Sequence, residues 1–328
     1  MKKMLLGIVW QLMGFIGIGG YFELERFSGR EYHEGLLGVN NGRNALLYLL
    51  KAWKIKRLYI PRFLCDSVSN LCTAYGFEFR YYAIGKDFLP VFSEKLNPGE
   101  YLYVVNFYGQ ISNETVLQLK QTYGNIIFDN IHAFYQRSVP SVDTIYSCRK
   151  FFGVPDGGYL ATDAVLDETL ERDTSAQRMK HILGRFEGCA SDYYGDFKAN
   201  DGSFAKLPLR KMSDLTKNLL RAIDYEAARK KRNENYARLA DGLGSRNQLK
   251  LRTPDGPYAY PFYCERGMEL KRKLAAEKIY VATLWPNVLE FEGTLEKDYA
   301  ENILPLPCDQ RYTAEDMTRI IDAIERLV

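Results

Sequence analysis

The residues best suited to chemistry stand in two short clusters within residues 125–162, which are Asp129 with His132 and Ser147 with Lys150. Each cluster directly follows a short apolar run, and such runs bounded by turn residues are typical of buried parallel strands. In open α/β sheets, ligands bind beyond the carboxyl ends of the strands. We therefore expect a carboxylate, an imidazole and an amine to share one crevice.

These side-chain types match the needs of a pyridoxal phosphate site. The neutral amine of a lysine such as Lys150 can form a Schiff base with an aldehyde. A carboxylate such as Asp129, facing a pyridine nitrogen, keeps the ring protonated and lets the cofactor accept electrons. His132 would stack on the ring or contact its substituents. Each residue also has a purely structural interpretation, as a core histidine, a surface lysine or an aspartate that caps a turn.

A third cluster, from Asn40 to Asn44, precedes apolar residues at helical spacing that predict a helix over 45–53. Free backbone N–H groups at a helix start attract anions, and a glycine there lets a phosphate approach closely. An ordinary asparagine cap is the alternative interpretation. We expect this helix start, or the Ser147 hydroxyl, to hold the cofactor phosphate.

Short apolar strands that alternate with helices predict an α/β fold, with a mainly parallel sheet and helices on both faces. The expected strands are 57–61, 78–84, 101–106, 126–128, 144–146 and 157–162, and the expected helices are 45–53, 66–75 and 114–123. The strand at 157–162 is expected to be antiparallel, because its connection to the preceding strand is short.

After residue 163 the pattern loosens, and a long helical segment follows at 218–243 with apolar residues near one face. We expect it to bridge a large cofactor-binding domain at 1–217 and a smaller one within 218–328. The smaller domain is predicted to be α/β, with a strand at 260–264, a helix at 268–277, a strand at 279–283 and a helix at 315–328.

Composition narrows the class of protein. The chain has 328 residues, of which 46% are hydrophobic and 26% are charged, as in ordinary globular proteins. A net charge of +3, with both signs spread along the chain, does not call for a nucleic-acid partner. Six scattered cysteines and three histidines form no metal-binding spacing, so we expect no metal. Isolated thiols suit a reducing compartment, and the cytoplasm is the expected location.

The N-terminus imitates a signal peptide, because Lys2 and Lys3 precede an apolar run from Met4 to Ile18. Gln11 and several glycines interrupt this run, which is also short for a membrane span. We therefore expect no stable membrane insertion. Met13 is an alternative start of translation.

Several motifs along nearly the whole chain resemble one enzyme family. They are Gly19-Gly20-Tyr21-Phe22-Glu23-Leu24, Asn41-Gly42-Arg43-Asn44-Ala45-Leu46, Tyr59-Ile60-Pro61, Phe128-Asp129-Asn130-Ile131-His132-Ala133-Phe134, Ser147-Cys148-Arg149-Lys150, Pro155-Asp156-Gly157-Gly158 and Leu306-Pro307-Cys308-Asp309-Gln310-Arg311-Tyr312. With them, the chain resembles the DegT/StrS-type sugar aminotransferases, which are fold-type-I pyridoxal phosphate enzymes.

The resemblance implies a role for each matched position. Asp129 would face the pyridine nitrogen, His132 would lie beside the ring, and Lys150 would form the internal aldimine. Gly42, Arg43 and Asn44 would lie at the phosphate. One branch of the family replaces the lysine by histidine and carries out deoxygenation, so the retained lysine favours amino transfer.

The implied reaction takes an amino group from an amino acid donor, usually glutamate in this family, and gives it to a nucleotide-linked keto-sugar. Lys150, once released from the cofactor, would move a proton between the substrate carbon and the cofactor. Members of the family resemble one another as homodimers that share the active site. Arginine and tyrosine side chains at 185–200 are candidates for the shared part.

The chain also departs from the family pattern. Relatives often have a serine five residues before the lysine, where this chain has Ile145, and an aromatic residue at the position of Cys65. The chain is also short for the family. These departures support an alternative function, that of a non-catalytic or regulatory paralogue that keeps the aminotransferase fold.

A hydrolase is a further alternative, because Ser147 and Lys150 also match the Ser-x-x-Lys motif of penicillin-recognising enzymes. Those enzymes have a Lys-Thr-Gly strand later in the chain, and this sequence contains no Lys-Thr-Gly. The aminotransferase interpretation is therefore favoured.

Overall fold

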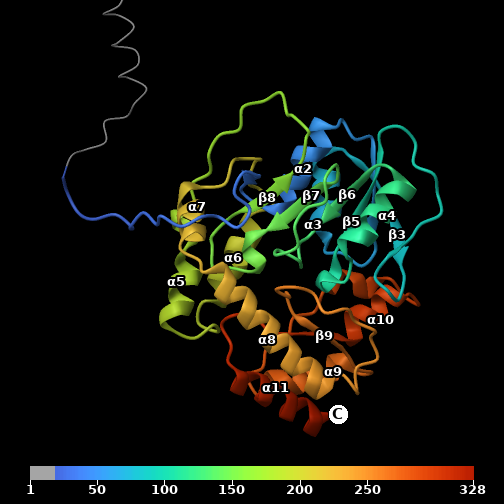
Figure 1. The fold of residues 1–328 in the computed structure, drawn as a ribbon, viewed down its shortest axis with the longest axis vertical. Coiled ribbons are helices and arrows are strands. Elements are labelled where there is room, and N and C mark those ends of the chain that lie inside the picture. The colour runs from blue at the N-terminus through green and yellow to red at the C-terminus, as the bar shows by residue number, and fades with distance from the viewer. Residues whose placement is uncertain (1–18) are drawn as a thin grey trace, which may run out of the picture.

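The computed structural model describes residues 19–328, and all elements named below belong to this range. The signal-like run and the alternative start at Met13 lie outside it. The described chain is built on a sheet whose strands are β1 (Leu37–Val39), β2 (Arg57–Pro61), β3 (Glu78–Ile84), β4 (Pro90–Val91), β5 (Glu100–Val105), β6 (Ile126–Asp129), β7 (Asp143–Ser147) and β8 (Gly158–Ala161) (Figure 1).

The strand order is β1-β8-β7-β6-β5-β2-β3-β4. Strands β7, β6, β5, β2 and β3 run parallel, whereas β8 and β1 at one edge and β4 at the other pair antiparallel. The predicted α/β fold with a mainly parallel sheet is confirmed, and so is the antiparallel strand near 157–162. All four residues of β6 are buried, as expected for a strand covered on both faces.

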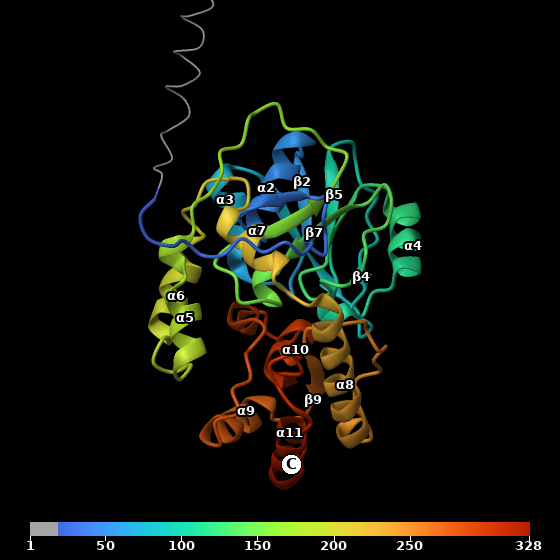
Figure 2. The same ribbon diagram turned by 60° about the vertical axis from the view of Figure 1, so that its left-hand side comes forward.

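Helices cover the sheet, and Figure 2 shows α4 on one side of it and α3 on the other. The helices within the described residues are α2 (Gly42–Ala52), α3 (Asp66–Tyr75), α4 (Asn113–Tyr123), α5 (Lys180–Glu187), α6 (Tyr194–Ser203), α7 (Asp214–Arg221), α8 (Tyr225–Leu243), α9 (Gly267–Ala276), α10 (Leu295–Asn302) and α11 (Ala314–Leu327). None of these helices has the length and apolar character needed to cross a membrane.

Local chemistry explains where the first helices begin and end. Asn41 caps α2, because its Oδ1 accepts the backbone N–H of Asn44 at 2.9 Å. Gly76 ends α3 in the left-handed region, with φ at 74°, where a residue without a Cβ is favoured. The sequence prediction for α3 is confirmed, and that for α2 began three residues too late because it counted only apolar positions.

The predicted helix at 218–243 is wrong in its continuity. The chain forms α7 and α8 instead, and the break between them ends at Asp224. The Asp224 carboxylate accepts the backbone N–H of Ala227 at 2.9 Å, so it starts a new helix. Apolar spacing continues across this break, and for that reason periodicity alone did not reveal it.

The C-terminal part contains a small antiparallel pair, β9 (Tyr260–Tyr263) with β10 (Ile303–Leu306). The predicted strand at 279–283 is wrong, because this segment is irregular and β10 takes the place beside β9. Pro305 lies opposite Pro261 in the register. Neither proline needs to donate to the ladder at that pair, so the two-stranded sheet tolerates residues that normally argue against a strand.

The described residues form three hydrophobic clusters, one of which contains aromatic side chains such as Phe134 and Phe151. The other two underlie the large and small parts. The smaller cluster joins α8, α9, α11, β9 and β10 around residues such as Leu239, Leu274 and Ile320. The larger cluster surrounds the main sheet and also takes in Trp285 and Tyr299 from the C-terminal part. The boundary between 1–217 and 218–328 therefore stays a prediction, since buried residues beyond it belong to the core of the large part.

Close packing at Gly158 yields a stability prediction. A Cβ at this position would lie 2.9 Å from the Tyr146 carbonyl oxygen and 3.1 Å from the Gly42 nitrogen, so only glycine lets the start of α2 sit against β8. We expect Gly158→Ala to lower the free energy of unfolding by about 1–3 kcal/mol, measured by urea denaturation. Gly195→Ala is the control, because its Cβ would meet nothing within 4 Å. Unchanged stability of Gly158→Ala would contradict this account.

Candidate active site

The candidate site lies where β6 and β7 end. The two strands are parallel neighbours, with Asp129 opposite Ile145. Asp129 is the last residue of β6, and the 3₁₀ helix η2 (Cys148–Lys150) follows β7 directly. A cavity of about 250 Å³ opens at this edge of the sheet, and Asp129, Ser147 and Lys150 all line it. The expected carboxylate and amine therefore share one crevice.

Asp129 is buried, and only one of its two oxygens is paired. Its Oδ2 accepts the hydroxyl of Tyr103 at 2.5 Å, whereas its Oδ1 has no partner among the described residues. Burial raises the pKa of Asp129 to about 6, against the opposing effects of the Tyr103 hydroxyl, the backbone N–H of Ile131 and the Lys150 charge. The pocket thus contains a carboxylate oxygen that is free to accept a proton or a hydrogen bond.

Tyr103 is a site residue that the sequence analysis missed. It lies on β5, beside Ile127 of β6, and it also lines the cavity. Its neighbours in sequence are all apolar or aromatic strand residues, so it looked like part of the core. Only the register between β5 and β6 brings its hydroxyl to Asp129.

The Lys150 amine lies over an aromatic side chain. Its Nζ is 5.8 Å from the ring centroid of Tyr258, within the range of a cation–π contact. Tyr258 in turn stacks on His132, with ring centroids 4.2 Å apart and an interplanar angle of 3°. His132 is fully buried, and burial holds its pKa well below its usual range, so the ring is neutral.

His132 lies behind the cavity wall and does not line it. The backbone N–H of Tyr108 donates to its Nδ1 at 3.4 Å, and its Nε2 has no partner among the described residues. The expected contact of His132 with a cofactor ring stays a prediction. In this structure, the imidazole supports Tyr258, which faces the lysine.

The start of α2 forms one wall of the cavity, through Asn41, Gly42 and Arg43. The first N–H groups of a helix have no partner within the helix, and together with the helix dipole they favour an anion. The Nδ2 of Asn41 is also buried and has no partner among the described residues. An unpaired donor, free N–H groups and a guanidinium therefore meet at one place.

Asn44 does not line the cavity. Its side-chain amide donates to the Asn40 Oδ1 at 2.7 Å and to the Pro208 carbonyl at 2.9 Å, and its backbone N–H is used by the Asn41 cap. The expected role of Asn44 at a phosphate stays a prediction, and in this structure these donors all bond to other groups of the protein. Asn44 instead fixes the segment before α7 against the start of α2.

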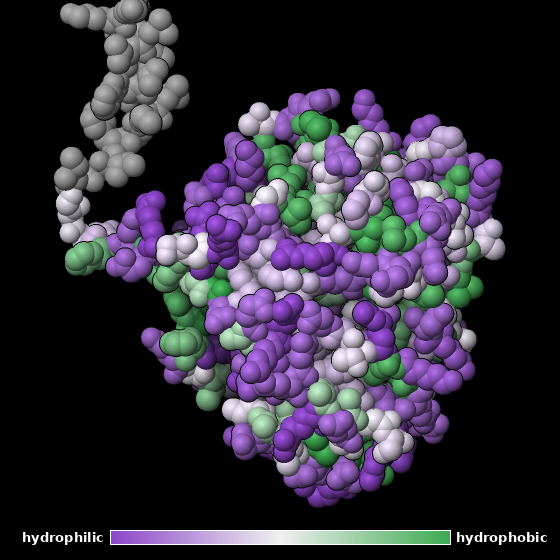
Figure 3. Space-filling view, in the orientation of Figure 1, coloured by the Kyte–Doolittle hydropathy of each residue, from purple (hydrophilic) through white to green (hydrophobic). Residues whose placement is uncertain are grey.

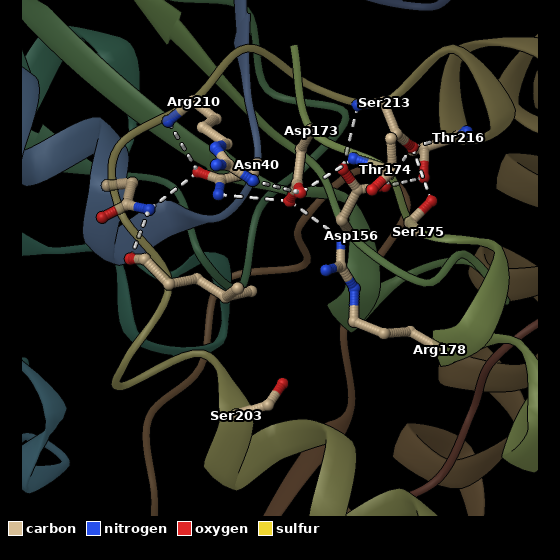
Figure 4. A network of polar contacts seen from close by, with 12 residues as sticks. Asn40, Asp156, Asp173, Thr174, Ser175, Arg178, Ser203, Arg210, Ser213 and Thr216 are labelled. Carbon is tan, nitrogen blue, oxygen red and sulfur yellow. Dashed lines mark hydrogen bonds and ion pairs between the residues drawn. The ribbon is translucent and has the colours of Figure 1, made fainter. Parts of the chain in front are cut away.

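A polar network extends from this point and holds the covering segments in place (Figure 4). Asn40 and Arg178 both donate to the buried Asp173, at 3.3 and 2.8 Å. Asp156 accepts both the backbone N–H and the hydroxyl of Ser213, the cap of α7, at 3.0 and 2.7 Å. Asp156 of the Asp-Gly-Gly motif is thus a structural residue that ties α7 to the sheet.

Arg149, the residue directly before Lys150, also lines the cavity. Its guanidinium lies 4.0 Å from the ring centroid of Phe204 and 3.3 Å from the Asp201 carboxylate. Asp201 belongs to α6, and both of these partners also line the cavity. Helix α6 therefore closes one side of the pocket through contacts with the residue directly before Lys150.

The remaining positions of interest also reach the cavity. Ser147, Ile145 and Cys65 line it, and so does Trp285 from the C-terminal part. The Cys65 thiol therefore lies in the same pocket as the Trp285 indole, which comes from a distant part of the chain. The described residues form no group of His, Cys, Asp or Glu side chains that could hold a metal ion.

Comparison with known proteins establishes the fold. No protein-family model and no curated protein sequence matches the chain. Among solved structures, DesV from S. venezuelae in complex with a ketimine intermediate superposes with a TM-score of 0.62 at 17% identity, covering 99% of this chain and 94% of that one. A DegT DnrJ EryC1 StrS aminotransferase from Brucella abortus gives 0.59 at 16% identity, covering 90% and 86%.

The PLP form of Spr1654 from Streptococcus pneumoniae, described as a putative sugar aminotransferase, gives a TM-score of 0.62 at 13% identity and covers 100% of this chain and 97% of that one. The resemblance inferred from the sequence motifs is thus confirmed at the level of the fold. At these identities, activity, cofactor and substrate are matters for proposal.

The raised pKa of Asp129 leads to a prediction about pH and stability. The carboxyl has a pKa of about 6 in the folded chain and 3.8 as its ordinary value, so folding takes up a proton between about pH 4 and pH 6. Asp129 therefore destabilises the fold as the pH rises through this window, by about 3 kcal/mol above it. We expect ligand-free Asp129→Asn to be more stable than wild type at about pH 8 and similar to it below about pH 4.

Urea denaturation at the two pH values checks this prediction. Asp241→Asn, an exposed position on α8, is the control and should leave the free energy of unfolding unchanged at both. A stability difference between wild type and Asp129→Asn that does not depend on pH would contradict the assignment.

Proposed function

We propose that this protein is a pyridoxal phosphate-dependent aminotransferase, which moves an amino group from an amino acid donor, glutamate, to a nucleotide-linked keto-sugar. The observation that carries the proposal is the buried, unpaired Oδ1 of Asp129 in the same cavity as the Lys150 amine. A carboxylate and a lysine in one pocket are what this cofactor requires of a protein. The sequence motifs and the shared fold support the same conclusion.

The residues present fit the cofactor. A protonated pyridine nitrogen would satisfy the free oxygen of Asp129, and a phosphate would satisfy the orphaned Nδ2 of Asn41 at the start of α2. Arg43 and Ser147, which line the same cavity, would add charge and a hydroxyl at the phosphate. Both orphaned atoms would otherwise cost stability, so a ligand with these groups explains why they persist.

The roles of the protein side chains follow from their chemistry. Pyridoxal phosphate, when bound, supplies an aldehyde that condenses with amines and a ring that accepts electrons from the adjacent carbon. Asp129 would keep a proton on the ring nitrogen. Lys150 would hold the aldehyde carbon at rest and would then carry a proton to and from the substrate carbon. Tyr103 would keep the Asp129 carboxylate oriented through its hydrogen bond.

The choice of glutamate and of a nucleotide-linked keto-sugar rests on the family resemblance of the motifs. The alternative, a regulatory paralogue that keeps the fold, rests on Cys65 and Ile145, which both line the cavity where relatives differ. Turnover separates the two, because a paralogue without activity would bind the cofactor and yet convert no amino donor.

We also propose that the protein is a homodimer located in the cytoplasm. Large apolar side chains on α5 and α6 are exposed, with Phe186 at 91% and Leu183 at 56%. In Figure 3 hydrophobic side chains gather at the left edge, where these two helices lie. A second subunit would cover such a surface. All six cysteines are free, which suits a reducing compartment.

Replacement of Lys150 tests the proposed function directly. We expect the wild-type protein to bind pyridoxal phosphate with a visible absorbance band and to retain it covalently at Lys150 after borohydride reduction, as mass spectrometry of peptides would show. Lys150→Ala should lose both signals and all turnover with glutamate. Lys273→Ala, an exposed lysine on α9, is the control. Wild-type protein that stays colourless with the cofactor would refute the proposal.

Replacement of Arg43 tests the phosphate site. A hydrogen bond to a charged group contributes about 1.5–3 kcal/mol, so Arg43→Ala should weaken pyridoxal phosphate binding roughly tenfold to hundredfold. Binding of pyridoxal, which lacks the phosphate, should change little. Equilibrium titration with the two ligands measures both affinities, and Arg272→Ala, an exposed arginine on α9, serves as control. An equal loss for both ligands would argue against a phosphate contact.

A further inference from the structure

Arg232 of α8 is among the most deeply buried side chains in the described chain, with an exposed fraction of 1%. Its guanidinium donates three hydrogen bonds to other segments. Nε donates to the Gln310 Oε1 at 2.7 Å, one terminal nitrogen to the Pro257 carbonyl at 2.7 Å, and the other to the Phe151 carbonyl at 3.1 Å. It also lies 4.5 Å from the ring centroid of Phe151.

Gln310 completes the arrangement. Its Nε2 donates to the same Phe151 carbonyl at 2.9 Å, while its Oε1 accepts from Arg232. The Phe151 carbonyl is therefore held by two donors that are themselves bonded to each other. Such a closed set of hydrogen bonds fixes the position of a backbone atom more strictly than one bond does.

A buried guanidinium without a paired carboxylate is costly. Asp309 is the acid whose charge acts most strongly on Arg232. Its carboxylate, however, accepts hydrogen bonds from Arg311 at 2.7 and 2.8 Å. No ion pair joins Arg232 to any described acidic residue within 4 Å. The Arg232 charge is stabilised mainly by carbonyl oxygens. The backbone segments that carry these carbonyls therefore indicate what Arg232 does.

The two carbonyls belong to the neighbours of two site residues. Phe151 directly follows Lys150, and Pro257 directly precedes Tyr258, whose ring lies 5.8 Å from the Lys150 Nζ. Arg232 itself does not line the cavity. One guanidinium thus ties together the backbone that carries the amine and the backbone that carries the ring facing it.

We propose that Arg232, together with Gln310, is a positioning unit that sets where the Lys150 amine stands relative to Tyr258. The inference rests on the proposed function, since it assigns a role in the capture of the cofactor aldehyde. Arg232 acts through the backbone and touches neither the cavity nor a ligand. A lysine in its place would keep the charge but could not span the three acceptors, because only the planar fork of arginine reaches them together.

The experiment compares two ligands that differ in their bond to Lys150. Pyridoxal phosphate is captured by the amine, whereas pyridoxamine phosphate fills the same site without bonding to it. A displacement of about 1 Å can cost a hundredfold in rate, so Arg232→Lys and Gln310→Ala should slow covalent capture at Lys150 roughly tenfold to hundredfold. Pyridoxamine phosphate binding should change less than about threefold, because its contacts lie elsewhere.

A matched control comes from the same helix. Arg238 donates to the Thr318 hydroxyl at 3.2 and 2.9 Å on an exposed face, so Arg238→Lys loses a similar fork and should leave both measurements unchanged. Thermal denaturation of each variant checks that the fold persists. Capture by Arg232→Lys at the wild-type rate would overturn the inference, and so would a parallel loss of pyridoxamine phosphate binding, which indicates a general structural role.

A second measurement separates this inference from the proposed function. In cofactor-free protein, a lysine-selective reagent modifies Lys150 at a rate that depends on the surroundings of the amine. Peptide mass spectrometry measures this rate over a range of pH. We expect Arg232→Lys and Gln310→Ala to alter this profile at Lys150 alone. An unaltered profile would overturn the inference. Absence of cofactor capture in the wild type would instead refute the proposed function, and the modification profile would still decide on positioning.

Discussion

The parallel pairing of β6 with β7 is the constraint on which the candidate site depends. Asp129 lies opposite Ile145, so both strands end at the same edge of the sheet and the acid and the lysine come into one cavity. Side chains alternate along a strand, and a shift of one residue would turn Asp129 away from Tyr103 and from the pocket. Burial of all four residues of β6 makes such a shift costly. The burial of β6 therefore also fixes the position of Asp129 in the pocket.

Two of the buried side-chain groups without a full set of partners, Asp129 and Asn41, lie in the wall of the cavity. Asp129, Asn41 and His132 each have a buried side-chain atom without a partner among the described residues, and each such atom costs about 1–3 kcal/mol. Natural structures keep costs of this kind mainly where function requires them. Elsewhere around the pocket, polar groups such as Asp156 are fully engaged. Unpaired buried atoms also occur on Tyr135, Arg178, Asn200 and Arg210, so a missing partner points to a ligand only where the residue also lines the cavity, as Asp129 and Asn41 do.

The C-terminal part contributes more to the site than a separate domain would. Trp285 lines the cavity, Tyr258 lies over the lysine, and Arg232 holds the turn after it. The site is therefore assembled between the edge of the sheet and segments that come much later in the chain. Any movement of α8 would be transmitted to Lys150 through the Phe151 carbonyl.

The sequence by itself determined the fold class and most strands, and it placed Asp129 and Lys150 at the ends of neighbouring strands, where they line one cavity. These features are local: a buried strand, a helix cap and a polar residue at a strand end each leave a pattern within a few neighbouring positions. The position of the α7–α8 break escaped prediction because apolar spacing runs through it, although the cap at Asp224 was visible.

Only the tertiary structure decided which residues meet. Tyr103 pairs with Asp129 through strand register, and the Asn44 amide donates to the Pro208 carbonyl. Strand β10 pairs with β9 across the 39 residues that lie between them in the chain. In the sequence, Arg232 looks like part of a charged helix face, and only the structure shows its three hydrogen-bond acceptors. Periodicity reports whether a side chain is buried, but not what it is buried against, and the chemistry of this site depends on those long-range partners.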